Sequence, residues 1–309
     1  AQDQRRRADE QRDETGKALD EAKRSVVPLQ VERGCRAIRD GDYFRALPWL
    51  AAALERDPDD EINRLRIRGL LDLSPLPEHI LQHGGPVGIA AFSRDGKRIL
   101  TAGQDALAIN SAAAARVWDA ASGRSIAGAW PHQAQIWHAE FDAAGERVAT
   151  ASEDRTAAVW SVADGKRLLE FRHDDAVRFA GFSPDGTQIL TAGKFGLALW
   201  DARTGARASI EFVAADHLLD ARFSPDGKRI VSSSNTGKAQ IWDAETGKTV
   251  GAPMMHDRNI WHAEFSPDGR RVVTGSFSGS LRIWDAATGK ETTNYLRHGG
   301  TLFWVGFSP

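Results

Sequence analysis

Residues 223–248 have the sequence FSPDGKRIVSSSNTGKAQIWDAETGK. An aromatic residue precedes the Asp226-Gly227 pair, and the β-branched run RIVSSS follows it at 229–234. Asp-Gly tolerates the positive φ that a tight hairpin requires. A further strand-like run ends at Trp242, and Asp-Ala-x-Thr-Gly follows it as a second turn signal. The stretch therefore predicts short antiparallel strands joined by tight turns.

This pattern recurs along most of the chain. The β-branched runs are RILTAG at 98–103, RVATAS at 147–152, QILTAG at 188–193, RIVSSS at 229–234 and RVVTGS at 271–276. Strands that end in tryptophan follow, at Trp118, Trp160, Trp200, Trp242 and Trp284. The aromatic residues before the turns are Phe92, Phe141, Phe182, Phe223, Phe265 and Phe307, which are 49, 41, 41, 42 and 42 residues apart. An internal repeat explains these intervals, and an insertion at 106–112 lengthens the first.

A period of this length, with four short strands and Trp-Asp at the end of the third, resembles the WD-repeat (WD40) β-propeller family. The resemblance covers residues 78–309 and implies an all-β propeller with five complete blades and the start of a sixth. Seven blades are usual in this family, so we expect about two further repeats in the complete protein. EHILQ at 78–82 is then expected to be an outer strand that closes the ring.

Histidines recur nine residues before the repeat phenylalanines, at His83, His132, His173, His256 and His298. The resemblance implies a buried hydrogen-bond network of a histidine, a Ser or Thr, an Asp and the strand-end Trp. One repeat matches all four positions, with His132, Ser152, Asp154 and Trp160. Lys194, Thr236 and Ser278 replace the Asp elsewhere, so we expect most blades to lack the full network. This regularity favours a structural role for these histidines.

The hexamer IWHAEF occurs twice, at 136–141 and 260–265. His138 and Glu140, like His262 and Glu264, are two residues apart and leave the same strand face. Each pair offers two ligands, fewer than the three protein ligands of a catalytic zinc. The two pairs are three repeats apart, so in a propeller they meet only across its central channel. We therefore expect no metal, no cofactor and no catalytic residue; an enzyme or metal-binding propeller that uses the central channel is the alternative.

The family resemblance also implies where partners bind. Contacts concentrate four and six residues before each repeat phenylalanine, and seven residues before each strand-end tryptophan. The partner-binding positions are Gln135, Trp137, Glu153, Arg178, His217, Leu219, Asn235, Asn259, Trp261, Phe277 and Phe303, with Ala176, Gly193 and Thr301 beside them and Pro86, Gly88 and Gln104 in the first blade. Aromatic residues and arginine dominate interface energies. The alternative is that the tryptophans pack in the seams between blades.

The N-terminal part has a different character. Residues 1–26 are rich in charges of both signs and predict a helical spacer; a dimerisation zipper is the alternative. Residues 27–73 resemble one tetratricopeptide repeat, at Gly34, Gly41, Tyr43, Ala46, Leu50, Ala53 and Pro58. A lone repeat of this kind does not bury both of its faces. We expect a packing or capping element; a peptide-binding groove is the alternative.

The amino-acid composition argues against several classes of function. The 309 residues include 40 Lys and Arg against 42 Asp and Glu, which disfavours a nucleic-acid-binding surface. The single cysteine, Cys35, excludes an internal disulfide, and no apolar run reaches the length of a membrane helix. We predict a non-catalytic scaffold that binds protein partners.

The order of charged helix, helical repeat and WD repeats also resembles the C-terminal region of large bacterial proteins, some with a Ser/Thr kinase domain. It suggests the sensing or scaffolding part of a signalling protein. The compartment is left open, cytoplasmic or tethered to a membrane through upstream sequence.

Overall fold

The computed structural model describes residues 28–38, 43–56, 60–73, 79, 81–104, 113–127, 129–194, 196–214, 216–292 and 296–307. The chain divides into two compact units, Ala1–Glu78 and His79–Pro309. The spacer expected over residues 1–26 and the insertion at 106–112 lie outside the described residues, as do Glu78 and Ile80 of the expected closing strand.

The first unit is helical. It contains a helix over residues 28–38, α2 (Tyr43–Arg56) and α3 (Glu61–Leu73). Ala46 and Leu50 of α2 are fully buried and pack with Leu70 of α3. A Cβ at Gly34 would lie 2.6 Å from Leu50 Cγ, so the glycine lets the first helix approach α2 closely. Gly41 and Pro58 lie outside the described residues, and the likeness to a tetratricopeptide repeat stays a prediction.

Polar groups fix the start of α3. The Asp60 carboxylate accepts the Asn63 N–H at 2.9 Å, which caps the helix N-terminus. The side chain of Asn63, buried, donates to the Leu50 carbonyl at 3.0 Å and ties α3 to α2. The opposite face of α3 exposes Ile62 and Leu65.

The second unit consists of antiparallel sheets in sequence order. The first sheet contains β1 (Val87–Phe92), β2 (Arg98–Gln104), β3 (Ala113–Asp119) and β4 (Trp130–His132). The second contains β5 (Ile136–Phe141), β6 (Arg147–Ser152), β7 (Thr156–Ser161) and β8 (Arg167–Arg172). The third contains β9 (Val177–Phe182), β10 (Gln188–Gly193) and β11 (Gly196–Asp201). The fourth contains β12 (Leu218–Phe223), β13 (Arg229–Ser234), β14 (Lys238–Asp243) and β15 (Thr249–Met255). The fifth contains β16 (Ile260–Phe265), β17 (Arg271–Ser276), β18 (Ser280–Asp285) and β19 (Leu296–Arg297).

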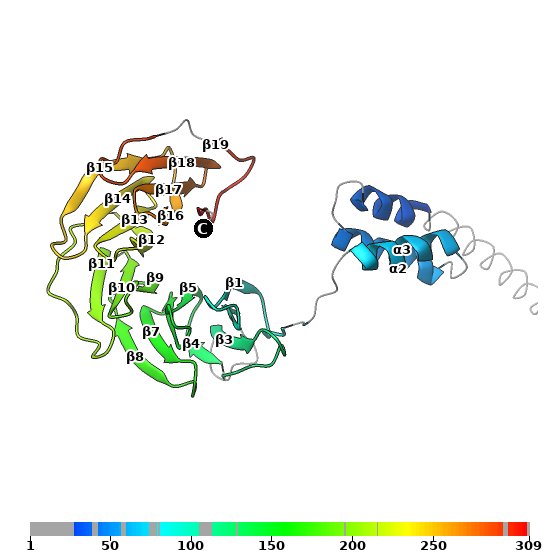
Figure 1. Ribbon diagram of the computed structural model, residues 1–309, viewed down its shortest axis with the longest axis horizontal. Helices are drawn as coiled ribbons and strands as arrows, with labels where there is room; N and C mark the ends of the chain where they lie inside the picture. The colour runs from blue at the N-terminus through cyan, green and yellow to red at the C-terminus, as the bar shows by residue number, and fades with distance from the viewer. Residues whose placement is uncertain are drawn as a thin grey trace, which may run out of the picture. The chain divides into compact units, whose positions relative to one another are not determined.

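These sheets fan around a common centre, with β5, β9, β12 and β16 innermost (Figure 1). Each sheet begins with its inner strand and proceeds outward through tight turns, as the repeat predicts. Gly227, in the first turn of the fourth sheet, has φ of +72°, which glycine adopts without strain. The propeller-like arrangement of four-stranded sheets is confirmed, whereas the number of blades and the closure of the ring stay predictions.

The third sheet differs from the expected complete blade, since among the described residues it has three strands. A single bridge joins Trp200 to Arg207, and Ala208 N–H donates to the Leu199 carbonyl at 2.8 Å. The segment then leaves the ladder, because Phe212 is buried edge-on against Trp242 of the next sheet, with ring centroids 6.1 Å apart.

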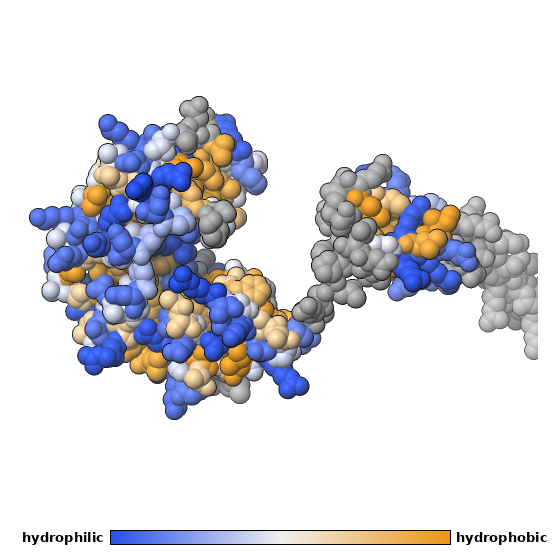
Figure 2. All heavy atoms as spheres, viewed as in Figure 1, coloured by the Kyte–Doolittle hydropathy of each residue, from blue (hydrophilic) through white to orange (hydrophobic). Residues whose placement is uncertain are grey.

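Apolar contacts between neighbouring sheets form the core. Small and branched residues, such as Val148, Ile189 and Ile230, fill the faces between sheets and are completely buried. Burial of such side chains is the main stabilising contribution in a packed interior. In Figure 2, hydrophilic residues cover much of the visible face of this unit, and hydrophobic residues show between them in smaller patches.

Candidate functional site

The inner strands share a β-bulge near their first residue. The pairing register with the next strand shifts between Ile136 and His138, between Leu218 and Asp220, and between Ile260 and His262. Trp137, Leu219 and Trp261 are therefore extra residues without a direct partner. Bulges redirect side chains at the ends of sheets. The bulges explain why the residue four positions before each repeat phenylalanine departs from the regular alternation of side chains between the two faces of the sheet.

The predicted partner-binding positions lie at one end of the sheets. Glu153 N–H donates to the Gln135 carbonyl at 2.9 Å, and Phe277 N–H donates to the Asn259 carbonyl at 2.8 Å. Each hydrogen bond holds the residue seven positions before a strand-end tryptophan beside the residue that precedes an inner strand. We name the surface formed by all these residues the bulge face: Gln135, Trp137, Glu153, Arg178, His217, Leu219, Asn235, Asn259, Trp261, Phe277 and Phe303.

One cluster on the bulge face centres on Trp137, which is half-buried. Its indole N–H donates to Glu153 Oε2 at 2.9 Å, and the Arg178 guanidinium lies 4.0 Å from the ring centroid. Such a cation–π contact favours one orientation of the ring. Burial, with Arg178 nearby, lowers the pKa of His217 below its ordinary value. The second, third and fourth sheets thus contribute to one cluster.

A second cluster is apolar. The rings of Trp261 and Phe303 lie 5.8 Å apart at 49°, and Thr301 Oγ1 donates to the Phe277 carbonyl at 3.2 Å. Phe277 is 44% exposed and Phe303 is 69% exposed, whereas Trp261 is half-buried. The sequence left two alternatives for Trp137 and Trp261, exposed anchors for a partner or packing in the seams between blades. In the structure both side chains are half-buried, so neither residue is a buried core residue or a fully exposed anchor.

The remaining polar members of the bulge face are joined to these clusters by backbone hydrogen bonds and not by their side chains. Among the described residues, the side-chain amides of Gln135, Asn235 and Asn259 form no hydrogen bond, and Leu219 is half-buried. The amides thus keep their donors and acceptors for water or a partner.

The histidine network within the second sheet uses a different hydroxyl from the expected one. Thr150 Oγ1 lies 2.8 Å from His132 Nε2 and accepts the Trp160 indole N–H at 2.9 Å. His132 Nδ1 lies 3.0 Å from Asp154 Oδ2. Ser152 instead donates to the Ala134 carbonyl and accepts the Asp154 N–H. Although burial opposes ionisation, hydrogen bonds from His132 and Thr156 hold the pKa of Asp154 well below its ordinary value.

The same hydroxyl position recurs in every sheet. The strand-end indoles of Trp118, Trp200, Trp242 and Trp284 donate to Thr101, Thr191, Ser232 and Thr274. His256 bridges Thr274 at 2.7 Å and Ser280 at 2.8 Å. Ser280 corresponds in the repeat to Thr156, whereas Ser278 stands at the position of Asp154. The hydroxyl–tryptophan link is present in the third, fourth and fifth sheets, where the aspartate is replaced.

Side chains of the inner strands meet at the centre in two layers. Residues one before the repeat phenylalanine form the first layer, and residues three before it form the second. The first layer contains Glu140, Gly181, Arg222, Glu264 and Gly306, and the second contains His138, Phe179, Asp220, His262 and Trp304. His138 lies 4.3 Å from Phe179, and His262 lies 5.8 Å from Trp304, between ring centroids. The two IWHAEF copies thus supply equivalent positions in separate blades.

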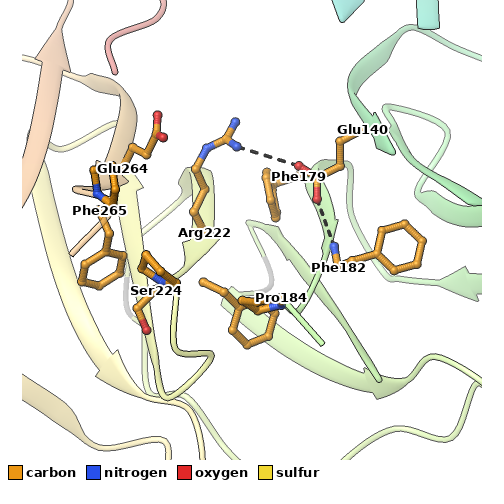
Figure 3. A pocket seen from close by; sticks show the side chains of 11 residues that line it. Glu140, Phe179, Phe182, Pro184, Arg222, Ser224, Glu264 and Phe265 are labelled. Atoms are coloured by element: carbon orange, nitrogen blue, oxygen red, sulfur yellow. Dashed lines mark hydrogen bonds and ion pairs between the residues drawn. The ribbon is translucent and has the colours of Figure 1, made fainter. Parts of the chain in front are cut away.

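Arg222 lies between these copies, and sequence reasoning missed it. Its guanidinium contacts Glu140 Oε2 at 3.8 Å, Asp220 Oδ2 at 3.5 Å and His138 Nε2 at 3.5 Å. Figure 3 shows Arg222 between Glu140 and Glu264, with the Phe182 N–H on the far side of Glu140. The repeat position directly before Phe223 was the available signal, because the same position holds Glu140 and Glu264 in their own repeats.

Burial shifts the pKa values of this network. It raises the pKa of Glu140 to about 7, against the influence of Arg222 and the Phe182 N–H, and it raises the pKa of Glu264. It lowers the pKa of His138 to about 3 and that of His262 to about 4. Burial opposes the ionisation of Asp220, but Arg222 outweighs it and lowers the pKa of that carboxyl. Both histidines are neutral at pH 7.

The network meets a pocket of about 260 Å³. Glu140, Arg222 and Glu264 line it together with phenylalanines of the inner strands and the prolines of the first turns. Within the described residues, no three His, Cys, Asp or Glu side chains are grouped to hold a metal ion. No helix in the described part of the chain has the length and apolarity needed to cross a membrane.

The repeated four-stranded sheets, the tryptophan at each third strand and the bulged inner strands define a WD-repeat β-propeller. The sequence profile of the family described as IFT122 first beta-propeller matches residues 86–309. The chain belongs to this family.

Individual relatives match shorter stretches. A WD repeat-containing protein WDS homolog of Arabidopsis thaliana is 41% identical over 76 residues, which are 23% of this chain and 14% of that protein. Eukaryotic translation initiation factor 3 subunit I of Pyricularia oryzae is 35% identical over 74 residues, 24% of this chain and 22% of that protein. Serine-threonine kinase receptor-associated protein of Dictyostelium discoideum is 29% identical over 62 residues, 20% of this chain and 21% of that protein. The chain therefore spans well under a third of the length of each of these relatives.

Proposed function

We propose that this chain is a non-catalytic scaffold that binds protein partners through the bulge face. The observation that carries the proposal is the pair of partly exposed aromatic clusters on that face, one around Trp137 and one around Trp261. Aromatic residues and arginine that are held by neighbours contribute most of the energy at protein interfaces. The unpaired amides of Asn235 and Asn259 supply the polar contacts that surround such anchors.

The names of two relatives support the same class of function. One denotes a subunit of a translation initiation factor, and another denotes a receptor-associated protein. The WD-repeat family is generally non-enzymatic. The alternative of an enzyme in the channel gains no support, because Arg222 rather than a third metal-binding side chain stands between Glu140 and Glu264. The narrower proposal of a bacterial signalling protein finds no support among the relatives.

The test combines Trp137→Ala with Trp261→Ala in the full chain. Partners are first captured from a lysate with the wild-type chain and identified, and one purified partner is then titrated calorimetrically. We expect the double variant to bind at least about 30-fold more weakly, equivalent to about 2 kcal/mol.

Leu168→Ala is the matched control, because Leu168 is an exposed apolar residue on the outer strand β8. Circular dichroism at increasing temperature verifies that all variants fold. Equal affinity of the double variant and the wild type would refute the choice of face.

A further inference from the structure

The pocket described above lies at the opposite end of the inner strands from the bulge face. The bulges occur near the first residues of these strands, whereas the pocket is lined by their last residues and by Pro184, Pro225 and Pro267 of the turns that follow. Residues of the second to fifth sheets take part. This second site is therefore spatially separate from the proposed partner surface and does not rest on it.

The lining combines apolar walls with a charged floor. Phe182, Phe265 and Pro184 contribute apolar walls, and Glu140, Arg222 and Glu264 contribute the charges (Figure 3). Phe223, Pro225 and Pro267 also line the pocket. A volume of about 260 Å³ is below the range of typical small-molecule pockets. The pocket admits one extended side chain rather than a nucleotide.

The acidic groups exceed the basic ones. Arg222 is the single cation of the lining, and its Nε lies 3.5 Å from Asp220 Oδ2 below the pocket. Glu140 receives a hydrogen bond from the Phe182 N–H on one oxygen and the looser 3.8 Å contact from Arg222 on the other. Glu264 makes no hydrogen bond or ion pair with any described residue. The site therefore has carboxylate oxygens with unused capacity to accept hydrogen bonds.

Two glycines make room for these carboxylates. A Cβ at Gly181 would collide with Glu140 Oε1, and a Cβ at Gly306 would lie 3.3 Å from Glu264 Oε2. Each glutamate therefore leans over the glycine at the same position of the following repeat. The arrangement occurs twice around the centre, with Arg222 between the two copies.

A buried polar group next to the floor is weakly partnered. The His262 side chain is 5% exposed, and its ring nitrogens have no close hydrogen-bond partner among the described residues, only a looser contact with the backbone at Val305. Its Nε2 lies 3.7 Å from Asp220 Oδ2, too far for a hydrogen bond. Unsatisfied polar groups in a packed interior are uncommon and often mark functional sites.

We propose that this pocket binds a positively charged alkyl group, namely a lysine or arginine side chain of a protein or a free alkylamine. The cationic head pairs with Glu264 and with Oε2 of Glu140, which Arg222 and His138 contact only at 3.8 Å. The alkyl stem packs on the phenylalanines and prolines at the mouth. A metal ion is a poorer occupant, because just two carboxylates reach the pocket and its walls are apolar.

Binding is expected to depend on pH. The charged and titratable groups around Glu140 are Arg222 and Asp220 on β12, His138 on β5, and Glu264 and His262 on β16. Burial raises the pKa of Glu140 to about 7, so that carboxyl is largely protonated at pH 6 and ionised at pH 8. A bound cation favours the ionised form. Affinity should therefore rise from pH 6 to pH 8, with release of protons near pH 7.

The test is calorimetric titration of the full chain with three peptides, acetyl-Gly-Gly-X-Gly-Gly-amide with X as lysine, arginine or norleucine. Cadaverine serves as a free amine. We expect a basic peptide to bind at pH 8 at least about tenfold more tightly than the norleucine peptide, and Glu264→Gln to remove that preference.

Glu245→Gln is the matched control, because Glu245 is an exposed glutamate in the turn between β14 and β15 that belongs neither to the pocket lining nor to the bulge face. Thermal melting verifies that both variants are folded. Cadaverine binding that depends on Glu264 would identify a free amine as the source of the charge, and binding of the peptides alone would identify a protein side chain. Equal binding of norleucine and basic peptides, or an unchanged preference in Glu264→Gln, would overturn the proposal.

Discussion

At the scale of single residues, one hydroxyl group joins the strand-end tryptophan to the rest of its sheet. In the second sheet the order of donation follows from the aspartate. The Asp154 carboxylate, an acceptor, faces Nδ1 of His132 and favours a proton there, which leaves Nε2 to face the Thr150 O–H. Thr150 in turn accepts the Trp160 N–H. Asp154, His132, Thr150 and Trp160 thus all form side-chain hydrogen bonds in a largely buried environment.

We expect Thr150→Val to destabilise the protein by about 1–3 kcal/mol, because it leaves the buried Trp160 N–H and His132 Nε2 without partners. Thr150→Ser keeps the hydroxyl and should lose clearly less. Urea unfolding followed by tryptophan fluorescence measures both. A loss in Thr150→Ser as large as that in Thr150→Val would contradict the dominant role of the hydroxyl, because the serine variant keeps it.

This residue also shows a limit of sequence reasoning. Thr150 and Ser152 are two positions apart on the same strand, so both side chains project from the same face of the sheet. The spacing of the sequence therefore predicted which face of the sheet carries the hydroxyl of the network, but not whether Thr150 or Ser152 reaches His132. In the structure the choice follows from the strand pairing, in which Thr150 lies opposite Ala158 and Val148 opposite Trp160.

At the scale of elements, an arginine at the start of the second strand joins neighbouring sheets in the first, second and fourth sheets. Arg98 donates to the Gly145 carbonyl at 2.6 Å, Arg147 to the Gly186 carbonyl at 3.0 Å, and Arg229 to the Gly269 carbonyl at 2.7 Å. Each acceptor lies in the first turn of the following sheet. The Arg229 guanidinium also lies 5.2 Å from the centroid of Phe265. The planar guanidinium suits both contacts at once.

We expect Arg229→Met to destabilise the protein by about 1–3 kcal/mol, because it keeps the apolar stem but removes the donors to the Gly269 and Ala286 carbonyls. Lys228→Met is the matched control, since Lys228 is an exposed neighbour with no such carbonyl contact. The urea midpoints of the two variants give the comparison. If both shift alike, the arginine does not hold the sheets together.

The repeat predicted these elements well because each strand and turn has its own local signal. The Asp-Gly turns and the β-branched runs specify their conformation wherever they occur. The irregular fourth segment of the third sheet was missed, because Phe212 leaves the ladder to contact Trp242 in the next sheet. The bulges were missed as well, since a bulge depends on how two strands pair rather than on either strand alone.

At the scale of the whole molecule, the charged centre arises from separate repeats. Glu140, Arg222 and Glu264 occupy the same repeat position, so the sequence placed them at the same level of the inner strands. It did not show that Arg222 lies between the glutamates, because this depends on the order of the sheets around the centre. Long-range placement of this kind sets the burial, and burial sets the pKa values.

These buried groups predict how stability depends on pH. Burial lowers the pKa of His138 to about 3, and those of His173, His256 and His262 to about 4. Between about pH 4 and the ordinary histidine pKa of 6.5, the unfolded chain binds more protons at these sites than the folded chain. Their contribution to the free energy of unfolding therefore rises with pH through this window and is complete above it.

Glu140 acts in the opposite direction. Its pKa rises from 4.5 to about 7 on folding, so its contribution is fully present below pH 4.5 and is lost as the pH rises through 7. Four histidines outweigh it below pH 6.5, where we expect stability to increase by at least about 1 kcal/mol per pH unit. Above pH 6.5 the histidine contribution levels off while Glu140 still opposes it, so the rise of stability with pH should flatten. Urea unfolding at pH 4.5, 5.5, 6.5 and 7.5 measures the curve. Glu140→Gln removes the opposing contribution, so stability should rise more steeply between pH 5.5 and 7.5 in that variant, and an unchanged slope would contradict the role of this buried carboxyl.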